Sequence, residues 1–198
     1  MRLNKKLALL IVSVLTLPLS AVAQVPKVKL VFTPEAEKFT AATKEYQELW
    51  QAEGDRIIEA IEQMTGFKFV ESEIKAVIFE GASSSGFRDT PMMLRASYTP
   101  EIKRATLVHE LGHRHNTQLA EREQSVDEHR VLFLWLYEAW VKLYGKEFAD
   151  RAVQVEKGRK GIYDYETAWN WALALSPAER AAKFKGLVNK NQTRLKLQ

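Results

Sequence analysis

One segment of this sequence is apolar on almost every side, and it constrains the possible folds more than any other feature. It spans Val126 to Tyr144 and includes the run VLFLWL at 131–136. A helix that is hydrophobic all round has to be buried among other elements. Ser125 and Glu128 have the spacing of a capping box, in which a serine caps the helix and a glutamate three residues later bonds back to it. We therefore predict one helix over 126–144, starting at this box and lying at the centre of a globular fold.

The composition is consistent with such a core and narrows the chemistry. Of the 198 residues, 46% are hydrophobic, 27% are charged and none is a cysteine. This is ordinary globular composition, and the length suits one compact domain. Without a thiol, the chain cannot form a disulfide-stapled scaffold, an iron–sulfur cluster, a cysteine-type zinc finger or a cysteine nucleophile. A metal site in this chain would therefore use nitrogen and oxygen ligands.

The N-terminus has the pattern of a secretory signal peptide. Arg2, Lys5 and Lys6 precede the apolar run 7–17, and the segment 20–23 consists of small residues and one valine. As a helix, the 11-residue apolar run would be roughly 17 Å long, which is too short for a hydrocarbon core of about 30 Å. We expect cleavage after residue 23 and export to the periplasm or the extracellular space.

Removal of residues 1–23 changes the charge balance. The whole chain has 29 basic and 25 acidic residues, a formal net charge of +4. Cleavage removes three basic residues and no acidic one, which leaves 26 basic against 25 acidic residues and a net charge of +1. This balance removes the main argument for a nucleic-acid partner. We also expect no membrane span after cleavage.

The rest of the sequence predicts mostly helices with a small sheet. The Thr-Pro-Glu sequences at 33–35 and 99–101 each combine an N-cap, a proline at the first helical position and an acid in the first turn. Gly66 can end the first of these helices in the left-handed conformation. We expect strands at 28–32, 67–70, 74–79 and 92–98, and helices at 34–65, 100–113, 126–144, 146–156, 166–175 and from 177 onward. The fold class is α+β, one domain over residues 24–198, predominantly helical, with the small sheet preceding the helix at 100–113.

All four histidines lie within 21 consecutive residues, at positions 109, 113, 115 and 129. The first two belong to the sequence HELGH at 109–113, inside a predicted helix. Positions four apart differ by about 40° around a helix, so His109 and His113 point the same way and can bind one divalent ion. Glu110 lies about 100° from His109 around the helix. Its carboxylate can therefore flank the ion and accept a proton from a metal-bound water.

The HELGH sequence resembles the active-site helix of the zincin metallopeptidases, which share the pattern HExxH. The order of the predicted elements is loosely similar as well, and Thr106 matches a preference of that family three residues before the first histidine. The resemblance implies a zincin-like fold in which a strand at the sheet edge aligns the substrate. It also implies a zinc ion bound by His109 and His113, Glu110 as general base, and a third protein ligand further along the chain.

Two branches of the zincins place the third ligand in characteristic patterns. The metzincin pattern HExxHxxGxxH is absent, because it would need glycine and histidine where the chain has Asn116 and Leu119. The gluzincins place a glutamate on a following helix. The candidates are Asp127, Glu128 and His129, 14 to 16 residues after His113, and the more distant Glu138.

Helical geometry separates these candidates. Glu128 has a structural explanation, because it closes the capping box. His129 shares a helix face with apolar residues and so points into the core, where an imidazole beside the HExxH helix is more easily explained as a ligand than as packing. We therefore expect His129 as the third ligand and keep Glu128 as the alternative. Asp127 is a weaker ligand candidate, and it could instead accept an imidazole N–H and fix the tautomer.

The remaining histidine, four of the tryptophans and two tyrosines are explained mainly by packing. His115 lies about 240° from His109 around the helix, so we expect it at the surface or behind the metal ligands. The tryptophans are expected in the core, at positions 135, 140, 169 and 171. Tyr137 and Tyr144 are candidates for an oxyanion donor, and they are equally compatible with one packed face.

These expectations describe a secreted zinc-dependent peptidase that hydrolyses peptide or protein substrates, with Glu110 as general base. Nitrogen and oxygen ligands also suit iron, manganese or nickel, and the resemblance favours zinc. One alternative is a catalytically silent metal-binding or interaction module on a zincin frame. Another is a helical exported protein without a metal, whose histidines are merely clustered.

Overall fold

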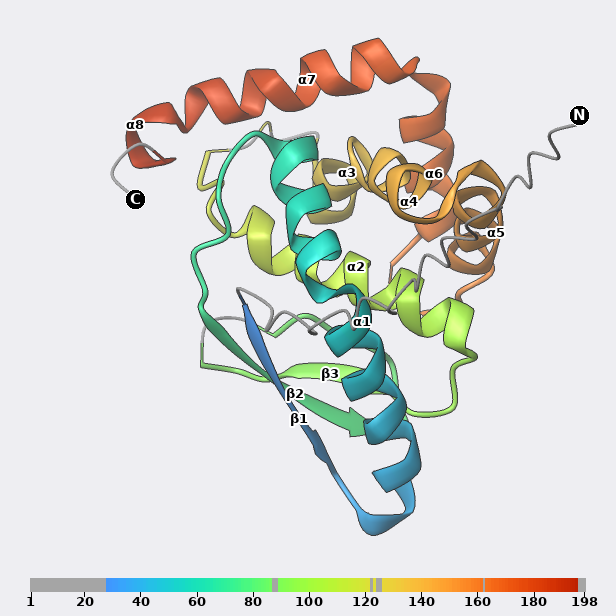
Figure 1. Ribbon diagram of the computed structural model, residues 1–198. Helices are drawn as coiled ribbons and strands as arrows, with labels where there is room; N and C mark the ends of the chain where they lie inside the picture. Colours follow the sequence, from blue (N-terminus) through green and yellow to red (C-terminus); the bar gives the residue numbers. More distant parts are fainter. Residues whose placement is uncertain (1–27, 87–88, 122, 124–125, 162, 196–198) are drawn as a thin grey trace, which may run out of the picture.

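The computed structural model describes residues 28–86, 89–121, 123, 126–161 and 163–195, and it has the predicted α+β class (Figure 1). The strands are β1 (Lys29–Pro34), β2 (Glu73–Phe79) and β3 (Met92–Arg95). The helices are α1 (Thr40–Thr65), α2 (Pro100–Asn116), α3 (Glu128–Phe133), α4 (Leu136–Tyr144), α5 (Lys146–Lys157), α6 (Tyr165–Ala174), α7 (Pro177–Lys190) and α8 (Gln192–Leu195). The sheet lies at one end of the molecule, and α7 runs across the other end (Figure 1).

The small sheet is entirely parallel, with β2 between β1 and β3. Parallel neighbours need a crossover, and α1 provides it between β1 and β2. The loop between β2 and β3 folds back, so that Ser84 forms an isolated antiparallel bridge with Met93. Alternate residues of the strands are buried, which shows that one face of the sheet packs into the core. They are Leu30, Phe32, Ile74, Ala76, Ile78, Met92 and Leu94.

The strand predicted at 67–70 is wrong. This segment joins no strand among the described residues. Its backbone groups are bonded by side chains instead: the carboxylate of Glu62 accepts from the N–H of Phe69 at 3.0 Å, and the amide of Gln118 donates to the carbonyl of Lys68 at 3.1 Å. Side chains thus take the place of a neighbouring strand.

The long first helix is confirmed over most of its length, but its predicted start is wrong. It ends before Gly66, which has the predicted left-handed conformation with φ 80°. Residues 33–34 belong to β1, where they pair with residues 77–78 of β2. Because the sheet takes the Thr-Pro pair, the helix begins only after the short 3-10 turn Glu37–Phe39.

The helix that carries HELGH begins as predicted. The side chain of Thr99 caps α2 by accepting from the backbone N–H of Ile102 at 3.4 Å, and Pro100 is the first helical residue. The helix was expected to reach His113 or a little beyond, and it extends to Asn116. The strand in front of it ends at Arg95 and is shorter than the predicted 92–98.

The segment 126–144 is buried as predicted, but it forms two helices instead of one. Every residue of 131–136 is at most 3% exposed. The helix breaks at 134–135, where the indole N–H of Trp135 donates to Asn116 of α2 at 3.3 Å. The start also differs: Asp127 caps α3 by accepting from the N–H of Arg130 at 2.9 Å. Ser125 of the predicted capping box lies outside the described residues.

The tryptophans join the central helices. Trp135, Trp140 and Trp169 are buried as predicted. The ring of Trp169 in α6 stacks on Phe133 at 3.9 Å and on Trp140 at 5.7 Å between centroids, so it links α3, α4 and α6. Trp171 is only partly buried.

The predicted signal peptide, residues 1–23, lies outside the described residues. In the described part of the chain, no helix combines the length and the apolar character needed to cross a lipid bilayer.

Candidate metal centre

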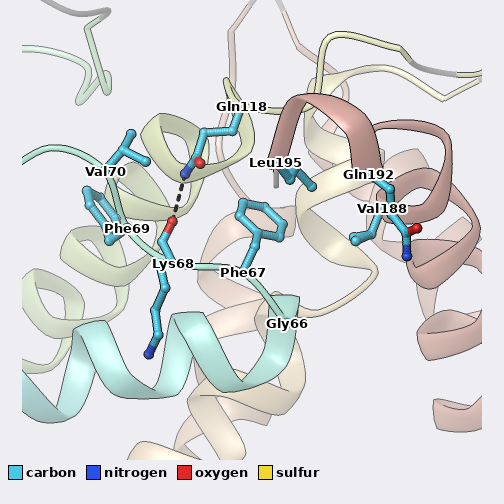
Figure 2. Close-up of a pocket in the computed structure, with 9 residues that line it drawn as sticks. All are labelled: Gly66, Phe67, Lys68, Phe69, Val70, Gln118, Val188, Gln192 and Leu195. Carbon is cyan, nitrogen blue, oxygen red and sulfur yellow. Dashed lines mark hydrogen bonds between the residues drawn. The ribbon is translucent and has the colours of Figure 1, made fainter. Parts of the chain in front are cut away.

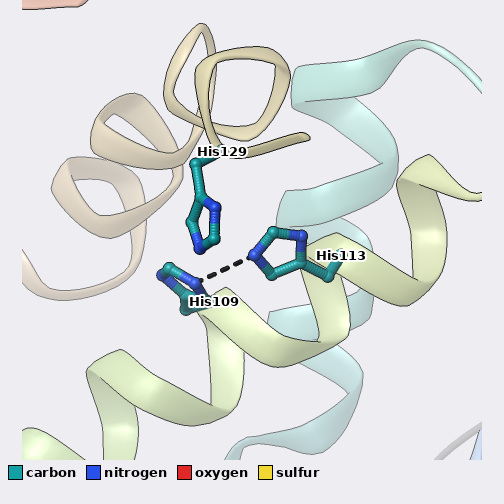
Figure 3. Close-up of side chains that lie close together, drawn as sticks. All are labelled: His109, His113 and His129. Carbon is teal, nitrogen blue, oxygen red and sulfur yellow. Dashed lines mark hydrogen bonds between the residues drawn. The ribbon is translucent and has the colours of Figure 1, made fainter. Parts of the chain in front are cut away.

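Three histidine side chains converge between α2 and α3 (Figure 3). His109 and His113 come from successive turns of α2, and His129 comes from the first turn of α3. Each offers one ring nitrogen, and these three atoms all lie within 4.8 Å of one another. His109 is buried, whereas His113 and His129 are partly exposed. The three imidazoles are thus close enough to bind a metal ion, and the cluster is open on one side.

Gly112 explains how α3 comes so close to α2. A Cβ atom at this position would lie 2.5 Å from Cδ1 of Leu132 and 2.8 Å from Cη2 of Trp135. Both distances are shorter than any normal contact, so only glycine permits this packing. The glycine inside the HELGH sequence therefore allows His129 to reach the two histidines of α2.

The separation of the ring nitrogens of His109 and His113 is compatible with a shared metal ion. Nε2 of His109 lies 3.1 Å from Nε2 of His113. Two nitrogens bound to one tetrahedral zinc ion at about 2.0–2.1 Å would lie about 3.3 Å apart. Burial lowers the pKa of His129 to about 4, and the neighbouring His109 acts in the same direction. His129 is therefore neutral at pH 7, as a metal ligand must be.

A buried carboxylate holds His109 from behind. Oε1 of Glu156 in α5 lies 2.7 Å from Nδ1 of His109, and both side chains are 1% exposed. The other oxygen, Oε2, accepts from the indole N–H of Trp169 at 2.9 Å. Burial acts to raise the pKa of Glu156, but His109, Arg159 and Trp169 outweigh it, so the pKa lies below its usual value. An ionised Glu156 favours a proton on Nδ1 of His109 and so leaves the Nε2 lone pair for a metal.

Glu110 lies next to this cluster and is 3% exposed. Burial raises the pKa of its carboxyl group, while His109 and Arg159 act in the opposite direction. Among the described residues, the set of groups within metal-binding distance contains the three histidines and not Glu110. Glu110 is thus a buried carboxyl group on the same helix as His109 and His113, and it is not one of the three clustered groups.

The carboxylates considered as ligands lie elsewhere. Glu128 is exposed at the start of α3. Asp127 caps the same helix and accepts from the hydroxyl of Tyr163 at 2.6 Å, so Glu156 rather than Asp127 is the carboxylate at His109. Glu138 forms an ion pair with Arg180.

His115 faces away from the cluster as predicted, but the predicted surface position is wrong. It is 1% exposed and lies between the rings of Phe67 and Phe69, with centroid distances of 4.2 and 5.1 Å. Its Nε2 lies 2.9 Å from Oγ1 of Thr65. Burial lowers the pKa of His115 to about 3. This histidine is a packed, neutral residue that attaches the segment 67–70 to α2.

Two tyrosines that the sequence did not single out border the cluster. The ring of Tyr163 stacks on His129 with 3.9 Å between centroids. The hydroxyl of Tyr165 lies 3.2 Å from Nε2 of His129, and burial raises the pKa of Tyr165 to about 12. Tyr165 is therefore protonated at neutral pH. The two tyrosines considered as oxyanion donors make other contacts. The hydroxyl of Tyr137 donates to Asp150, and the ring of Tyr144 packs on Phe148.

Glu156 could have been recognised from the sequence. Ala149, Ala152, Val153 and Glu156 occupy positions i, i+3, i+4 and i+7 of the helix, and all four are buried. A glutamate on the apolar face of a helix needs a partner in the core. Tyr163 and Tyr165 give no such signal, because they follow a glycine-containing loop and only the tertiary fold brings them to His129.

A groove of about 680 Å³ lies away from the histidines (Figure 2). It is lined by the segment 66–70, Gln118 and residues of α7 and α8. Phe67 lies in its wall, and the bond from Gln118 to Lys68 closes one side (Figure 2). None of the three clustered histidines lines this groove.

Comparisons with known proteins give no relative for this chain. No family model matches the sequence, and no curated protein and no solved structure matches it at a significant level.

Proposed function

We propose that this protein is a zinc-dependent peptidase of the zincin type. The observation that carries the proposal is the convergence of three imidazoles from α2 and α3, with a buried glutamate next to the first of them on the same helix. Three protein ligands and an open side distinguish a catalytic zinc site from a structural one. The partly exposed His113 and His129 leave such an open side.

The donor set supports zinc as the metal. Imidazole nitrogens bind zinc, copper, iron and nickel, and tetrahedral nitrogen ligation in hydrolases is typical of zinc. When bound, zinc would lower the pKa of a coordinated water to about 7 and polarise a substrate carbonyl. The site retains His109 as a nitrogen donor because Glu156 keeps its proton on the opposite ring atom.

Glu110 is proposed as the general base and, later, the general acid. Burial raises the pKa of its carboxyl group above the usual value, while His109 and Arg159 act in the opposite direction. A carboxyl group beside the reacting water can accept a proton and later return it. In peptide hydrolysis Glu110 would take a proton from the attacking water and pass it to the leaving amine.

Tyr165 is proposed to stabilise the oxyanion that forms when water attacks. Its hydroxyl lies 3.2 Å from Nε2 of His129 and remains protonated at neutral pH. A positioned hydrogen-bond donor at such a place contributes to catalysis because it meets the charge that develops in the transition state. The N-terminal signal pattern adds that the substrate is an extracellular or periplasmic peptide or protein.

The proposal is tested by the metal content and the activity of three proteins. Wild type, Glu110→Gln and the control Glu128→Gln are purified without residues 1–23, and cleavage of unfolded casein is measured with one equivalent of zinc. We expect Glu110→Gln to retain zinc and lose activity by at least about 100-fold, whereas Glu128→Gln keeps both. Equal activity of wild type and Glu110→Gln would remove the assigned base. Stoichiometric zinc without cleavage by the wild type would favour a metal-binding module without turnover.

A further inference from the structure

We propose that the substrate carries a carboxylate and that Arg159 binds it. This inference rests on the proposed function and adds the substrate class. Arg159 lies directly after α5, and its side chain reaches the α2 face that bears Glu110, where Nη2 donates to Thr106 at 3.2 Å. Thr106 is one turn before Glu110 on α2, so the guanidinium lies beside the proposed base.

The guanidinium is held in place but not enclosed. Its central carbon lies 5.9 Å from the ring centroid of Tyr98 and 5.6 Å from that of Tyr165. Aromatic faces attract a guanidinium and fix its plane. The side chain of Arg159 is 18% exposed, so part of it is accessible to a ligand. A planar fork of N–H donors held in this way matches a carboxylate.

The charge of Arg159 is only partly balanced by its neighbours. Nη1 is 3.5 Å from Oε1 of Glu156, whereas that same oxygen is 2.7 Å from His109. Glu156 is therefore closer to His109 than to Arg159 and balances the charge of Arg159 only in part. With a divalent ion at the histidines, the buried positive charges would exceed those of Glu110 and Glu156. The positive potential beside Arg159 would then favour an anionic group on the substrate.

A pocket next to Arg159 can take the side chain of the residue that carries the carboxylate. It has a volume of about 200 Å³ and lies between the first half of α2 and α5. Arg159 and Glu156 line one side of it, and Ile102, Ala105 and Val155 provide an apolar lining. Ala105 is one turn before His109, so the pocket and the metal centre share one face of α2. At the edge of the pocket, Glu101 accepts from Arg151 at 2.7 Å, and these two charges compensate each other.

The carboxylate can come from two parts of a peptide. One is the C-terminal α-carboxylate, which would make the protein an exopeptidase that removes residues from the C-terminus. The other is the side chain of an aspartate or glutamate inside the chain. Both present the same planar anion to Arg159, and a set of matched peptides separates them.

The test measures peptide binding to the Glu110→Gln protein, which is expected to bind the peptides without cleaving them. The zinc-loaded Glu110→Gln protein is titrated in a calorimeter with a leucine-ending pentapeptide that has no acidic side chain, as the free acid and as the amide. An amidated peptide with an internal glutamate and its glutamine analogue form the second pair. We expect the carboxylate member of one pair to bind about 10- to 100-fold more tightly than its neutral partner.

The same titrations are repeated with Arg159→Gln and Arg159→Lys in the Glu110→Gln background, and with Lys160→Gln as an exposed neighbouring control. Arg159→Gln should abolish the preference, Arg159→Lys should retain part of it, and Lys160→Gln should leave it unchanged. Zinc content and the melting temperature show whether each variant keeps the site intact. Equal affinity within both pairs for the parent protein, or a preference that persists in Arg159→Gln, overturns the proposal.

The outcome is independent of whether the protein proves to be a peptidase. If the preference depends on Arg159 while the wild type cleaves no peptide, the carboxylate site stands and the peptidase assignment fails. If the wild type cleaves peptides, Glu110→Gln does not, and the two members of each pair bind with equal affinity, the peptidase stands and the carboxylate site fails.

Discussion

Substitution of Glu156 by glutamine tests how far the fold prepares the metal centre. Both carboxylate oxygens of Glu156 are used: Oε1 lies 2.7 Å from Nδ1 of His109, and Oε2 accepts from the indole of Trp169 at 2.9 Å. Glutamine offers one acceptor oxygen and one NH₂ group, so either His109 or Trp169 would face a second donor. No water can replace the lost acceptor easily, because Glu156 is 1% exposed.

The expected loss follows from this arrangement. Removing the carboxylate partner of a ligating histidine lowers metal affinity about 10- to 100-fold, which corresponds to about 1.4 to 2.8 kcal/mol. The metal-free protein should also lose about 1–3 kcal/mol of stability, because one buried donor loses its acceptor. We expect the loss of zinc affinity to be about 100-fold, since both His109 and Glu156 are buried.

Zinc affinity is measured by competition with a chromophoric chelator at pH 7.5, and stability by urea unfolding of the metal-free protein. Glu147→Gln is the matched control, because Glu147 lies on the same helix and is exposed. It should leave both quantities unchanged. A zinc affinity of Glu156→Gln within twofold of the wild type would refute the role of this carboxylate at His109.

Two further predictions concern packing and pH. Gly112→Ala should destabilise the protein, because overpacking against Leu132 and Trp135 costs about 1–3 kcal/mol and the gain in helix propensity is at most about 1 kcal/mol. It should also weaken zinc binding by moving α3, and a variant with unchanged melting temperature and zinc affinity would contradict the close approach of the helices. Burial lowers the pKa of His115 from 6.5 to about 3, so the unfolded chain takes up a proton below pH 6.5 that the folded chain does not. The metal-free wild type should therefore lose about 2 kcal/mol between pH 7.5 and pH 5 through this residue, and His115→Gln should show a loss smaller by that amount in urea unfolding; an identical loss would contradict the burial argument.

The parts of the site that the sequence predicted are those set by local geometry. The cap at Thr99 fixes the start of α2, and the spacing of four residues then brings His109 and His113 to one face. His129 was predicted as a ligand because a polar imidazole on the apolar face of a buried helix requires a partner in the core. Its position beside the other two histidines agrees with that expectation.

The parts that the sequence did not predict depend on contacts between distant elements. The break at 134–135 accompanies the packing of Trp135 against Gly112 and Asn116, and no propensity of the segment itself indicates it. The segment 67–70 has the composition of a strand, but the side chains of Glu62 and Gln118 take its backbone groups. The local sequence pattern cannot show whether a backbone group will bond to a neighbouring strand or to a side chain.

The side chains around the three histidines were not predicted: the helical pattern could have shown that Glu156 is buried, but not that His109 is its partner. Glu156 and Tyr165 are 47 and 56 residues after His109 in the chain and meet it only because α5 and α6 pack on α2 and α3. Arg159 reaches Thr106 across this same interface. The sequence pattern thus identified the three clustered histidines, whereas the side chains that surround them could be placed only from the fold.

The identity of the third ligand is the most direct test of the metal centre. Zinc stoichiometry and affinity are measured for His129→Ala and, beside it, for Glu128→Ala, with unfolding of both metal-free proteins to confirm that they fold. If the three converging imidazoles hold the ion, Glu128→Ala binds one zinc per chain with wild-type affinity and His129→Ala binds it far more weakly. Wild-type zinc binding by His129→Ala, with loss of zinc from Glu128→Ala, would contradict this account.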